Sequence, residues 1–88
     1  MIDINNIQRI FFIGIGGIGM SALARYFHHK GAVVSGYDRT STPLTRQLEA
    51  EGIAVHYYDD VALLDKSAQL VVYTPAIPAH HTQLNWYK

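Results

Sequence analysis

The chain has 88 residues, no cysteine and a formal net charge of zero, because seven Lys and Arg balance seven Asp and Glu. Apolar residues make up 49% of it and charged residues 16%. This length suffices for one small domain, and the composition is that of a folded chain rather than a disordered one. The lack of cysteine excludes disulfides and thiolate metal ligands. Zero net charge gives no general attraction to nucleic acid or to anionic lipid.

The longest apolar and glycine-containing run extends from Ile10 to Ala24. Ser21 interrupts it and four glycines lie within it, so it does not match the roughly 20 apolar residues of a membrane-spanning helix. The first residues lack the basic region of a signal peptide. We therefore expect a cytoplasmic protein without membrane or nucleic-acid partners.

Four short segments predict β-strands. They share a run of apolar side chains, many of them β-branched or aromatic, which is typical of strands buried on both faces of a parallel sheet. These segments are residues 9–15, 32–37, 53–57 and 69–74.

Helical spacing follows the first strand. It begins at Ile18 and ends before Gly31, a residue suited to the left-handed position after a helix. The predicted apolar face of this helix comprises Ile18, Ala22, Leu23, Tyr26 and Phe27.

A second helix is predicted to begin where Ser41 and Thr42 precede Pro43, because hydroxyl residues cap helices and proline is accepted in the first helical position. Its apolar residues are Leu44, Leu48 and Ala50, and Gly52 ends it. Asp59 or Asp60 is expected to cap a turn after the third strand. The tail from His80 or Thr82 to Lys88 predicts a further helix.

The alternation of strands and helices with short connections predicts right-handed βαβ units. We expect a Rossmann-like α/β fold, with an open parallel sheet of strand order 3-2-1-4 and helices on both faces. Its topological switch point lies between the first and fourth strands, and such sheets bind ligands there, outside the carboxyl ends of the strands.

The residues Gly14-Ile15-Gly16-Gly17-Ile18-Gly19 match G-x-G-x-x-G between a strand and a helix. Glycines allow a sharp turn and close approach to a ligand, and a helix N-terminus offers unpaired N–H groups with about half a positive charge. This context predicts a diphosphate site, and a tight turn without a ligand is the alternative. Gly19 is expected to let helix and strand pack closely, and Ser21 to serve the ligand or the first helical turn.

Two other segments end strands on the same side of the sheet. Asp38 follows the second strand, 24 positions after Gly14, where an acid accepts hydrogen bonds from ribose hydroxyls; a simple turn residue is the alternative. Arg39 is expected to stack on a base or to pair with Asp38. Thr74-Pro75-Ala76-Ile77-Pro78 lines the same crevice or forms a rigid proline turn.

Other polar clusters favour structural roles. Adjacent histidines on a helix point about 100° apart and chelate poorly, so His28-His29 and His80-His81 predict solvated side chains rather than a metal site. Trp86 and Tyr87 are expected to pack, and Asp59-Asp60 to cap a helix rather than act as an acid/base pair. We predict no catalytic residue and no metal ligand in this chain.

The residues from Ile13 to Ser21, together with Ser35-Gly36-Tyr37-Asp38 and the segment from Thr74 to Pro78, resemble the N-terminal domain of the Mur ligase family of peptidoglycan synthesis. The resemblance runs from about Ile7 to the end. In that family the first of three domains binds a UDP-sugar, the second ATP and the third the amino acid. The resemblance implies that residues 1–88 are a single N-terminal UDP-sugar-binding domain, truncated at its C-terminus and lacking one further strand.

By this resemblance the ligand is UDP-N-acetylmuramate. Its diphosphate is expected on residues 14–19, which we call the glycine loop, and its uridine at Asp38. The segment that begins at Thr74 is expected along the diphosphate and sugar. The residues implied in binding are Gly14, Ile15, Gly16, Gly17, Ile18, Gly19, Met20, Ser21, Asp38, Arg39, Thr40, Thr74, Ala76 and Ile77.

The resemblance also implies that the parent enzyme uses ATP and Mg²⁺ to join L-alanine to UDP-N-acetylmuramate. The chain contains no G-x-x-x-x-G-K-[ST] sequence, which cradles ATP phosphates, so we expect no cofactor and no activity for this part alone. The alternatives are a ligase that attaches a murein peptide to the same nucleotide sugar in cell-wall recycling, an NAD(P)-binding oxidoreductase domain, and a non-catalytic nucleotide sensor.

Overall fold

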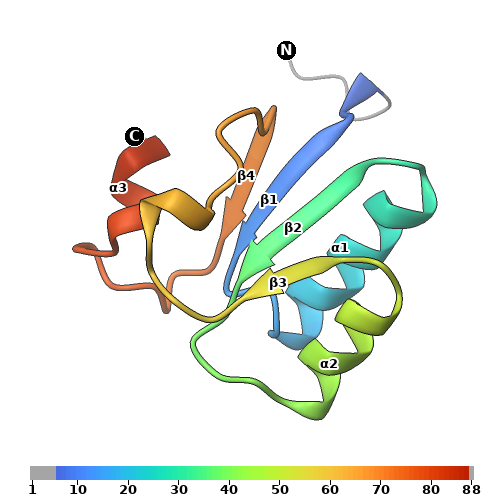
Figure 1. Ribbon diagram of the computed structural model, residues 1–88, viewed down its shortest axis with the longest axis horizontal. Helices are drawn as coiled ribbons and strands as arrows, with labels where there is room; N and C mark the ends of the chain where they lie inside the picture. Colours follow the sequence, from blue (N-terminus) through green and yellow to red (C-terminus); the bar gives the residue numbers. More distant parts are fainter. Residues whose placement is uncertain (1–5, 88) are drawn as a thin grey trace.

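The computed structural model describes residues 6–87 and has a four-stranded parallel sheet at its centre (Figure 1). Its strands lie in the order β3-β2-β1-β4, which confirms the predicted order and fold class. The strands are β1 (Arg9–Ile13), β2 (Val33–Tyr37), β3 (Ala54–His56) and β4 (Leu70–Tyr73).

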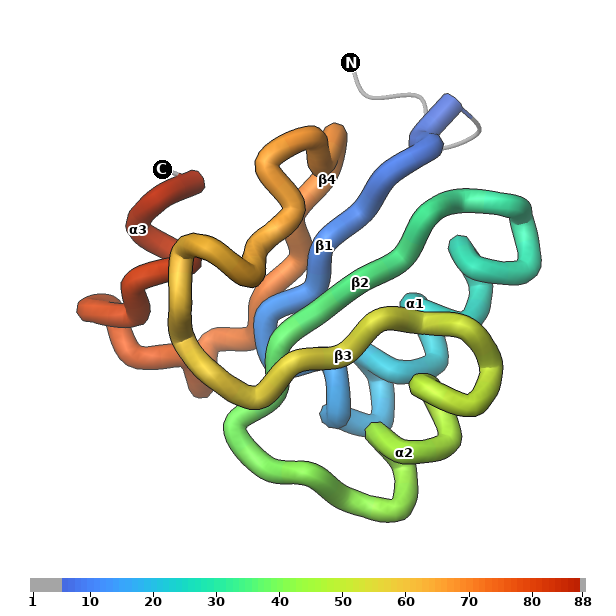
Figure 2. Tube along the Cα trace, in the orientation of Figure 1, coloured from blue at the N-terminus to red at the C-terminus, as the bar shows by residue number. Residues whose placement is uncertain are grey.

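Helices cover both faces of the sheet. One face carries α1 (Ile18–His29) and α2 (Pro43–Ala50), and the other carries the short 3₁₀ helix η2 (Val61–Leu63) and α3 (Thr82–Tyr87) (Figure 1). The chain starts at the centre of the sheet with β1, moves outward through β2 to β3, and then crosses back to β4 on the other side of β1 (Figure 2). No helix within residues 6–87 is both long and apolar enough to cross a bilayer.

Alternate residues of β1 serve the two halves of the core. Ile10 and Phe12 pack with Val34 beneath α1 and α2, whereas Phe11 and Ile13 belong to a smaller cluster beneath η2 and α3. These four residues, from Ile10 to Ile13, are fully buried. The continuous apolar run thus reflects a strand that is covered on both faces.

All four strands are one or two residues shorter than predicted, and β1 is shorter because its end turns into the glycine loop. Ile15 belongs to the same apolar run as β1, but the N–H groups of Gly14 and Ile15 both donate to the carbonyl of Tyr37, at 2.8 and 2.9 Å. This shared acceptor ends the ladder with β2 at Ile13. The Ile15 side chain remains fully buried in the core.

The predicted buried face of α1 is confirmed at Phe27 and wrong elsewhere. Ser21, Ala24 and Phe27 are its buried residues, whereas Ile18 is 87% and Tyr26 46% exposed. A serine is tolerated in this face because its hydroxyl donates to the Ile18 carbonyl at 3.0 Å and so has a partner.

The predicted ends of α1 and α2 are confirmed. Thr42 caps α2, with its hydroxyl accepting from the Thr45 N–H at 3.1 Å while the Thr45 hydroxyl accepts from the Thr42 N–H at 2.8 Å. Pro43 occupies the first turn. Gly31 and Gly52 follow the helices with φ of 92° and 101°, the left-handed backbone that favours glycine.

The C-terminal helix packs through Tyr87. The Tyr87 ring lies 5.7 Å from that of Phe11, and its hydroxyl donates to the Asp65 carbonyl at 2.7 Å. The predicted packing role is confirmed for Tyr87. Trp86 lies against Tyr87 but stays 45% exposed. Lys88, at which the predicted helix ended, lies outside the described residues.

Candidate functional site

The glycine loop joins β1 to α1 and begins with a left-handed residue. Gly14 has φ of 92°, and a Cβ atom built on it would lie 2.7 Å from Thr74 Cγ2. Glycine at this position therefore allows both the turn and the close approach of the segment after β4.

The first turn of α1 offers free hydrogen-bond donors. No side chain caps this helix, and within residues 6–87 the N–H groups of Ile18, Gly19 and Met20 have no hydrogen-bond partner. Free amides at the positive end of a helix are suited to an anion. Together with Gly17, the residue before this turn, they form a candidate anion site.

Asp38 is already engaged with the glycine loop. Its Oδ2 accepts a hydrogen bond from the Gly16 N–H at 2.7 Å, and its Oδ1 accepts one from the Thr40 N–H at 3.1 Å. A Cβ atom on Gly16 would lie 2.7 Å from Asp38 Oδ2 and 2.8 Å from Thr45 Cγ2. Gly16 thus allows the loop to approach Asp38 and α2.

The role predicted for Gly19 is wrong. A Cβ atom on Gly19 would meet nothing within 4 Å, so this glycine does not bring α1 close to a strand. Gly36 in β2 does allow a close contact, but with β1 and the glycine loop rather than with a helix, because a Cβ atom there would lie 2.6 Å from Ile15 Cδ1 and 2.8 Å from the Phe12 carbonyl oxygen.

A cavity of about 350 Å³ opens at the carboxyl ends of β1, β2 and β4, within the range of about 300–1,000 Å³ typical of ligand sites. Its lining includes seven of the predicted binding residues, namely Gly14, Gly17, Asp38, Arg39, Thr74, Ala76 and Ile77. Pro78, at the end of the segment predicted to line the crevice, also lines it, as do Tyr37 and His81. Tyr37 directly precedes the predicted Asp38, but nothing local marks His81.

The other seven predicted binding residues do not line this cavity. Ile15 is in the core, Met20 packs against the core beneath α1, and Ser21 is buried with its hydroxyl bound to a carbonyl. The remaining four contribute backbone N–H groups. Those of Gly16 and Thr40 donate to Asp38, and those of Ile18 and Gly19 belong to the uncapped first turn of α1.

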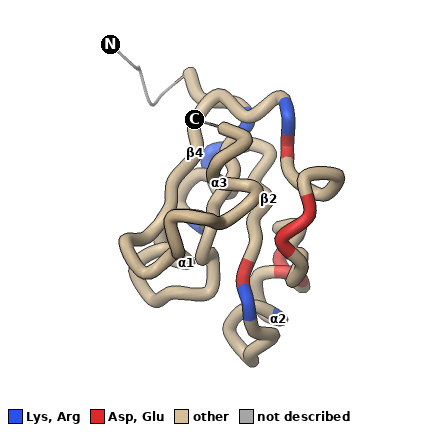
Figure 3. The backbone as a smooth tube through the Cα atoms, turned by 90° about the vertical axis from the view of Figure 1, so that its left-hand side faces the viewer, with Lys and Arg blue, Asp and Glu red and all other residues tan. Residues whose placement is uncertain are grey.

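Arg39 is exposed, and none of the ion pairs within residues 6–87 joins it to Asp38, so the predicted pairing is not formed. Its guanidinium is thus available to a ligand at the mouth of the cavity. Across the described chain Lys and Arg are scattered rather than gathered in one stripe (Figure 3).

The segment from Thr74 to His81, which we call the second wall, faces the glycine loop across the cavity. It folds on itself through hydrogen bonds from the Ala76 N–H to the Thr74 hydroxyl at 2.9 Å and from the Ile77 N–H to the Thr74 carbonyl at 3.1 Å. At its other end the His81 N–H donates to the Pro78 carbonyl at 3.0 Å.

The expectation of solvated histidines is wrong for His81, which is only 6% exposed. Its ring packs edge-on against Tyr37, with centroids 4.7 Å apart, and its Nδ1 lies 3.3 Å from Asp59 Oδ1. His29 and His80 are exposed, and His28 is half-buried beside Gly52. Within residues 6–87 no group of three His, Asp or Glu side chains is arranged to hold a metal ion.

The two neighbouring aspartates have the predicted capping role, each at a different helix. Asp60 caps η2 by accepting from the Ala62 N–H at 2.9 Å, and Asp59 accepts from the N–H groups that begin α3. Burial alone would raise the pKa of Asp59, but these N–H donors and nearby His81 lower it below its usual value. Burial, with the charges of Asp59 and Asp38, raises the pKa of Tyr37.

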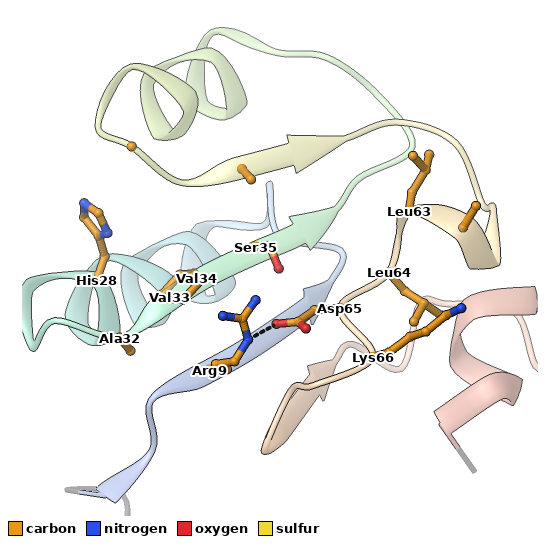
Figure 4. Close-up of a pocket in the computed structure, with 13 residues that line it drawn as sticks. Arg9, His28, Ala32, Val33, Val34, Ser35, Leu63, Leu64, Asp65 and Lys66 are labelled. Carbon is orange, nitrogen blue, oxygen red and sulfur yellow. Dashed lines mark hydrogen bonds and ion pairs between the residues drawn. The ribbon is translucent and has the colours of Figure 1, made fainter.

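A larger cavity of about 700 Å³ lies beside the amino-terminal halves of the strands (Figure 4). Its lining includes Arg9, Val33 and Ala54 near the starts of β1, β2 and β3, and Arg9 is bound to Asp65 at 3.0 Å. No residue of the glycine loop or of the second wall lines it. Because ligands in open α/β sheets bind outside the carboxyl ends of the strands, we assign the ligand site to the smaller cavity.

Comparison with known proteins shows the family of the chain. The family model described as the catalytic domain of the Mur ligase family matches residues 9–86. The chain belongs to the Mur ligase family. The match includes the glycine loop, Asp38 and the second wall.

Curated relatives of this Mur ligase chain are much longer. A UDP-N-acetylmuramate–L-alanine ligase of Christiangramia forsetii is 53% identical over 94 residues, covering 100% of this chain and 21% of the relative. One of Porphyromonas gingivalis is 54% identical over 86 residues, covering 92% and 19%. The chain thus spans about a fifth of the length of these relatives.

Solved structures show the same fold. A UDP-N-acetylmuramate-alanine ligase of Thermotoga maritima matches with a TM-score of 0.83 and 32% identity, covering 89% of this Mur ligase chain and 18% of that one. The UDP-N-acetylmuramate:L-alanyl-gamma-D-glutamyl-meso-diaminopimelate ligase of Neisseria meningitides matches with a TM-score of 0.79 and 34% identity, covering 91% and 25%.

Proposed function

We propose that this chain is the UDP-N-acetylmuramate-binding part of a cytoplasmic ligase that adds L-alanine to this nucleotide sugar in peptidoglycan synthesis. The observation that carries the proposal is the cavity between the second wall and the glycine loop, which leads into the free amides of α1. It occurs in a chain that shares about half of its residues with enzymes named for this reaction.

The residues around the cavity suit the parts of such a ligand. The diphosphate would lie on the free amides of Ile18, Gly19 and Met20, where the helix end stabilises negative charge without any net basicity. Asp38 keeps lone pairs for ribose hydroxyls beyond its two bonds to N–H groups, since a carboxylate offers about four acceptor sites. Ile77 adds an apolar contact from the second wall.

ATP and Mg²⁺ do not fit the residues of this chain. The ATP-cradling sequence is absent, and within residues 6–87 no cluster of side chains is arranged for a metal ion. We therefore propose that ATP, Mg²⁺ and L-alanine bind to other parts of the parent enzyme. The role of this part is to bind and orient the nucleotide sugar.

The ligase that acts on a murein peptide is a second candidate, because the TM-score of the Neisseria structure, 0.79, is close to the 0.83 of the Thermotoga enzyme. Both names include UDP-N-acetylmuramate, so the ligand proposed for this chain is the same in either case. The eight curated relatives that are 46–54% identical, all named as L-alanine ligases, favour L-alanine.

Isothermal titration of the 88-residue chain tests the ligand proposal. We expect UDP-N-acetylmuramate and UDP to bind, and NADH and ATP to bind at least about tenfold more weakly, a difference of about 1.4 kcal/mol. Backbone NMR spectra recorded during the titration should shift at the α1 amides and at Asp38. Tighter binding of NADH than of UDP would instead support an oxidoreductase domain and would contradict the proposal.

A further inference from the structure

Asp59 binds the start of α3 although it lies in a different loop and does not line the ligand cavity. Its Oδ2 accepts from the Thr82 N–H at 2.7 Å and its Oδ1 from the Gln83 N–H at 2.8 Å. The same Oδ1 lies 3.3 Å from His81 Nδ1. The loop after β3 is thus joined to residues more than 20 positions later in the chain.

His81 connects Asp59 to the cavity. It is the last residue of the second wall, and it also packs against Tyr37, which directly precedes Asp38. Because one imidazole contacts both the end of β2 and the carboxylate of Asp59, its position affects both sides of the cavity.

Apart from Ile77, which packs against the core cluster of Phe11 and Ile13, the rest of the second wall is mostly exposed. Ala76, Pro78 and Ala79 are exposed. Its remaining hydrogen bonds come from within the wall or from α3, as in the bond from Asn85 Nδ2 to the Ala79 carbonyl at 3.0 Å. Among residues 6–87, the polar contacts that reach the second wall and the first residue of α3 from outside this C-terminal segment come from Asp59.

We propose that Asp59 is a positioning residue of the nucleotide-sugar site. By holding His81 and the start of α3, its carboxylate keeps the second wall at the separation from the glycine loop that the ligand requires. This inference rests on the proposed function, because it concerns the same ligand.

The burial of His81 supports an anchor at this position. Its Nε2 is buried and has no hydrogen-bond partner within residues 6–87. Enclosing such an atom is unfavourable, so other contacts must offset the cost. Asp59 provides one through a charged oxygen, and its lowered pKa keeps it ionised at neutral pH.

The variant Asp59→Asn tests the proposal, with Asp60→Asn as a matched control. Asn at position 59 keeps one acceptor oxygen but loses the second oxygen and the charge. Asn at position 60 still caps η2, because Asn is as good a cap as Asp. We expect Asp59→Asn to weaken binding of UDP-N-acetylmuramate about tenfold in isothermal titration, and Asp60→Asn to leave it unchanged.

A purely structural role would affect the whole fold, whereas a positioning role has a local signature. At saturating ligand, NMR of Asp59→Asn should show the wild-type shifts at the amides of Ile18, Gly19 and Met20. The ligand-induced shifts at Thr74, Ala76 and Ile77 should be lost. Wild-type affinity together with wild-type shifts at the second wall would overturn the proposal, whereas a wild-type chain that does not bind the ligand would overturn the proposed function instead.

A milder variant covers the case in which Asp59→Asn does not fold. Thr82→Pro removes the N–H that donates to Asp59 Oδ2, together with the Thr82 hydroxyl that also bonds Asp59, at a first helical position that accepts proline. We expect the same loss of shifts at the second wall with a smaller loss of affinity. Unchanged affinity and unchanged wall shifts in this variant would likewise overturn the role of Asp59.

Discussion

Glycines that look equivalent in the sequence meet different neighbours in the structure. Gly14 approaches Thr74 and Gly16 approaches Asp38, whereas Gly19 has no neighbour that a Cβ atom would meet. The G-x-G-x-x-G pattern correctly indicates a turn followed by an open helix end. It does not indicate which glycine is required by a ligand and which by the protein itself.

Gly14→Ala should therefore disturb both the fold and the site. Its φ of 92° is strained for alanine, and the added Cβ would press on Thr74, so we expect a loss of more than about 1 kcal/mol in the free energy of unfolding. Urea unfolding measures this loss.

Gly19→Ala is the matched control, because this position is helical and open. It should stabilise the chain by about 0.5–1 kcal/mol. Equal effects of the two substitutions would contradict the different roles assigned to these glycines.

Short-range signals in the sequence predict the individual strands and helices well. Apolar runs identify the four strands, and Thr42 with Pro43 identifies the start of α2. Contacts between distant segments are not visible in this way. Asp59 was recognised as a cap, but its partner helix is more than 20 residues away, and no local pattern indicates that His81 becomes buried beside it.

The buried face of α1 shows a second limit of sequence reasoning. Hydrophobicity favoured Ile18 and Tyr26, yet the sheet contacts the face that contains Ser21 and Ala24. Small side chains permit close packing of the helix on the sheet, and the serine hydroxyl finds a partner within its own helix. Apolar periodicity alone does not account for either effect.

The reciprocal hydrogen bonds between Thr42 and Thr45 are expected to stabilise the start of α2. Thr42→Ala removes the side chain that accepts from the Thr45 N–H, so we expect a loss of about 1 kcal/mol in the free energy of unfolding. Thr40→Ala, at an exposed residue outside the helix, serves as the control in the same urea titration. A Thr42→Ala variant as stable as this control would show that the cap contributes nothing.

For the whole molecule, stability should fall at alkaline pH. Burial, reinforced by the charge of Asp65, raises the pKa of Tyr87 to about 12, compared with about 10 in an unfolded chain. Because the folded value is the higher one, this contribution is complete below about pH 10 and is lost as the pH rises toward 12. The raised pKa of Tyr37 acts in the same direction.

Tyr87→Phe tests the alkaline dependence. The variant loses the hydrogen bond to the Asp65 carbonyl and should be less stable at pH 8 by about 1 kcal/mol. Between pH 8 and pH 11, however, its free energy of unfolding should decline less than that of the wild-type chain. An identical decline in both chains would show that Tyr87 does not carry this pH dependence.

In the proposed complex the nucleotide sugar lies between the first turn of α1 and the second wall. A crystal structure of the chain with UDP-N-acetylmuramate tests it most directly. We predict diphosphate oxygens about 2.7–3.2 Å from the N–H groups of Ile18, Gly19 or Met20, with Thr74 and Ile77 on the other side of the ligand. A ligand bound instead in the larger cavity, beside Arg9 and Lys66, would contradict the account.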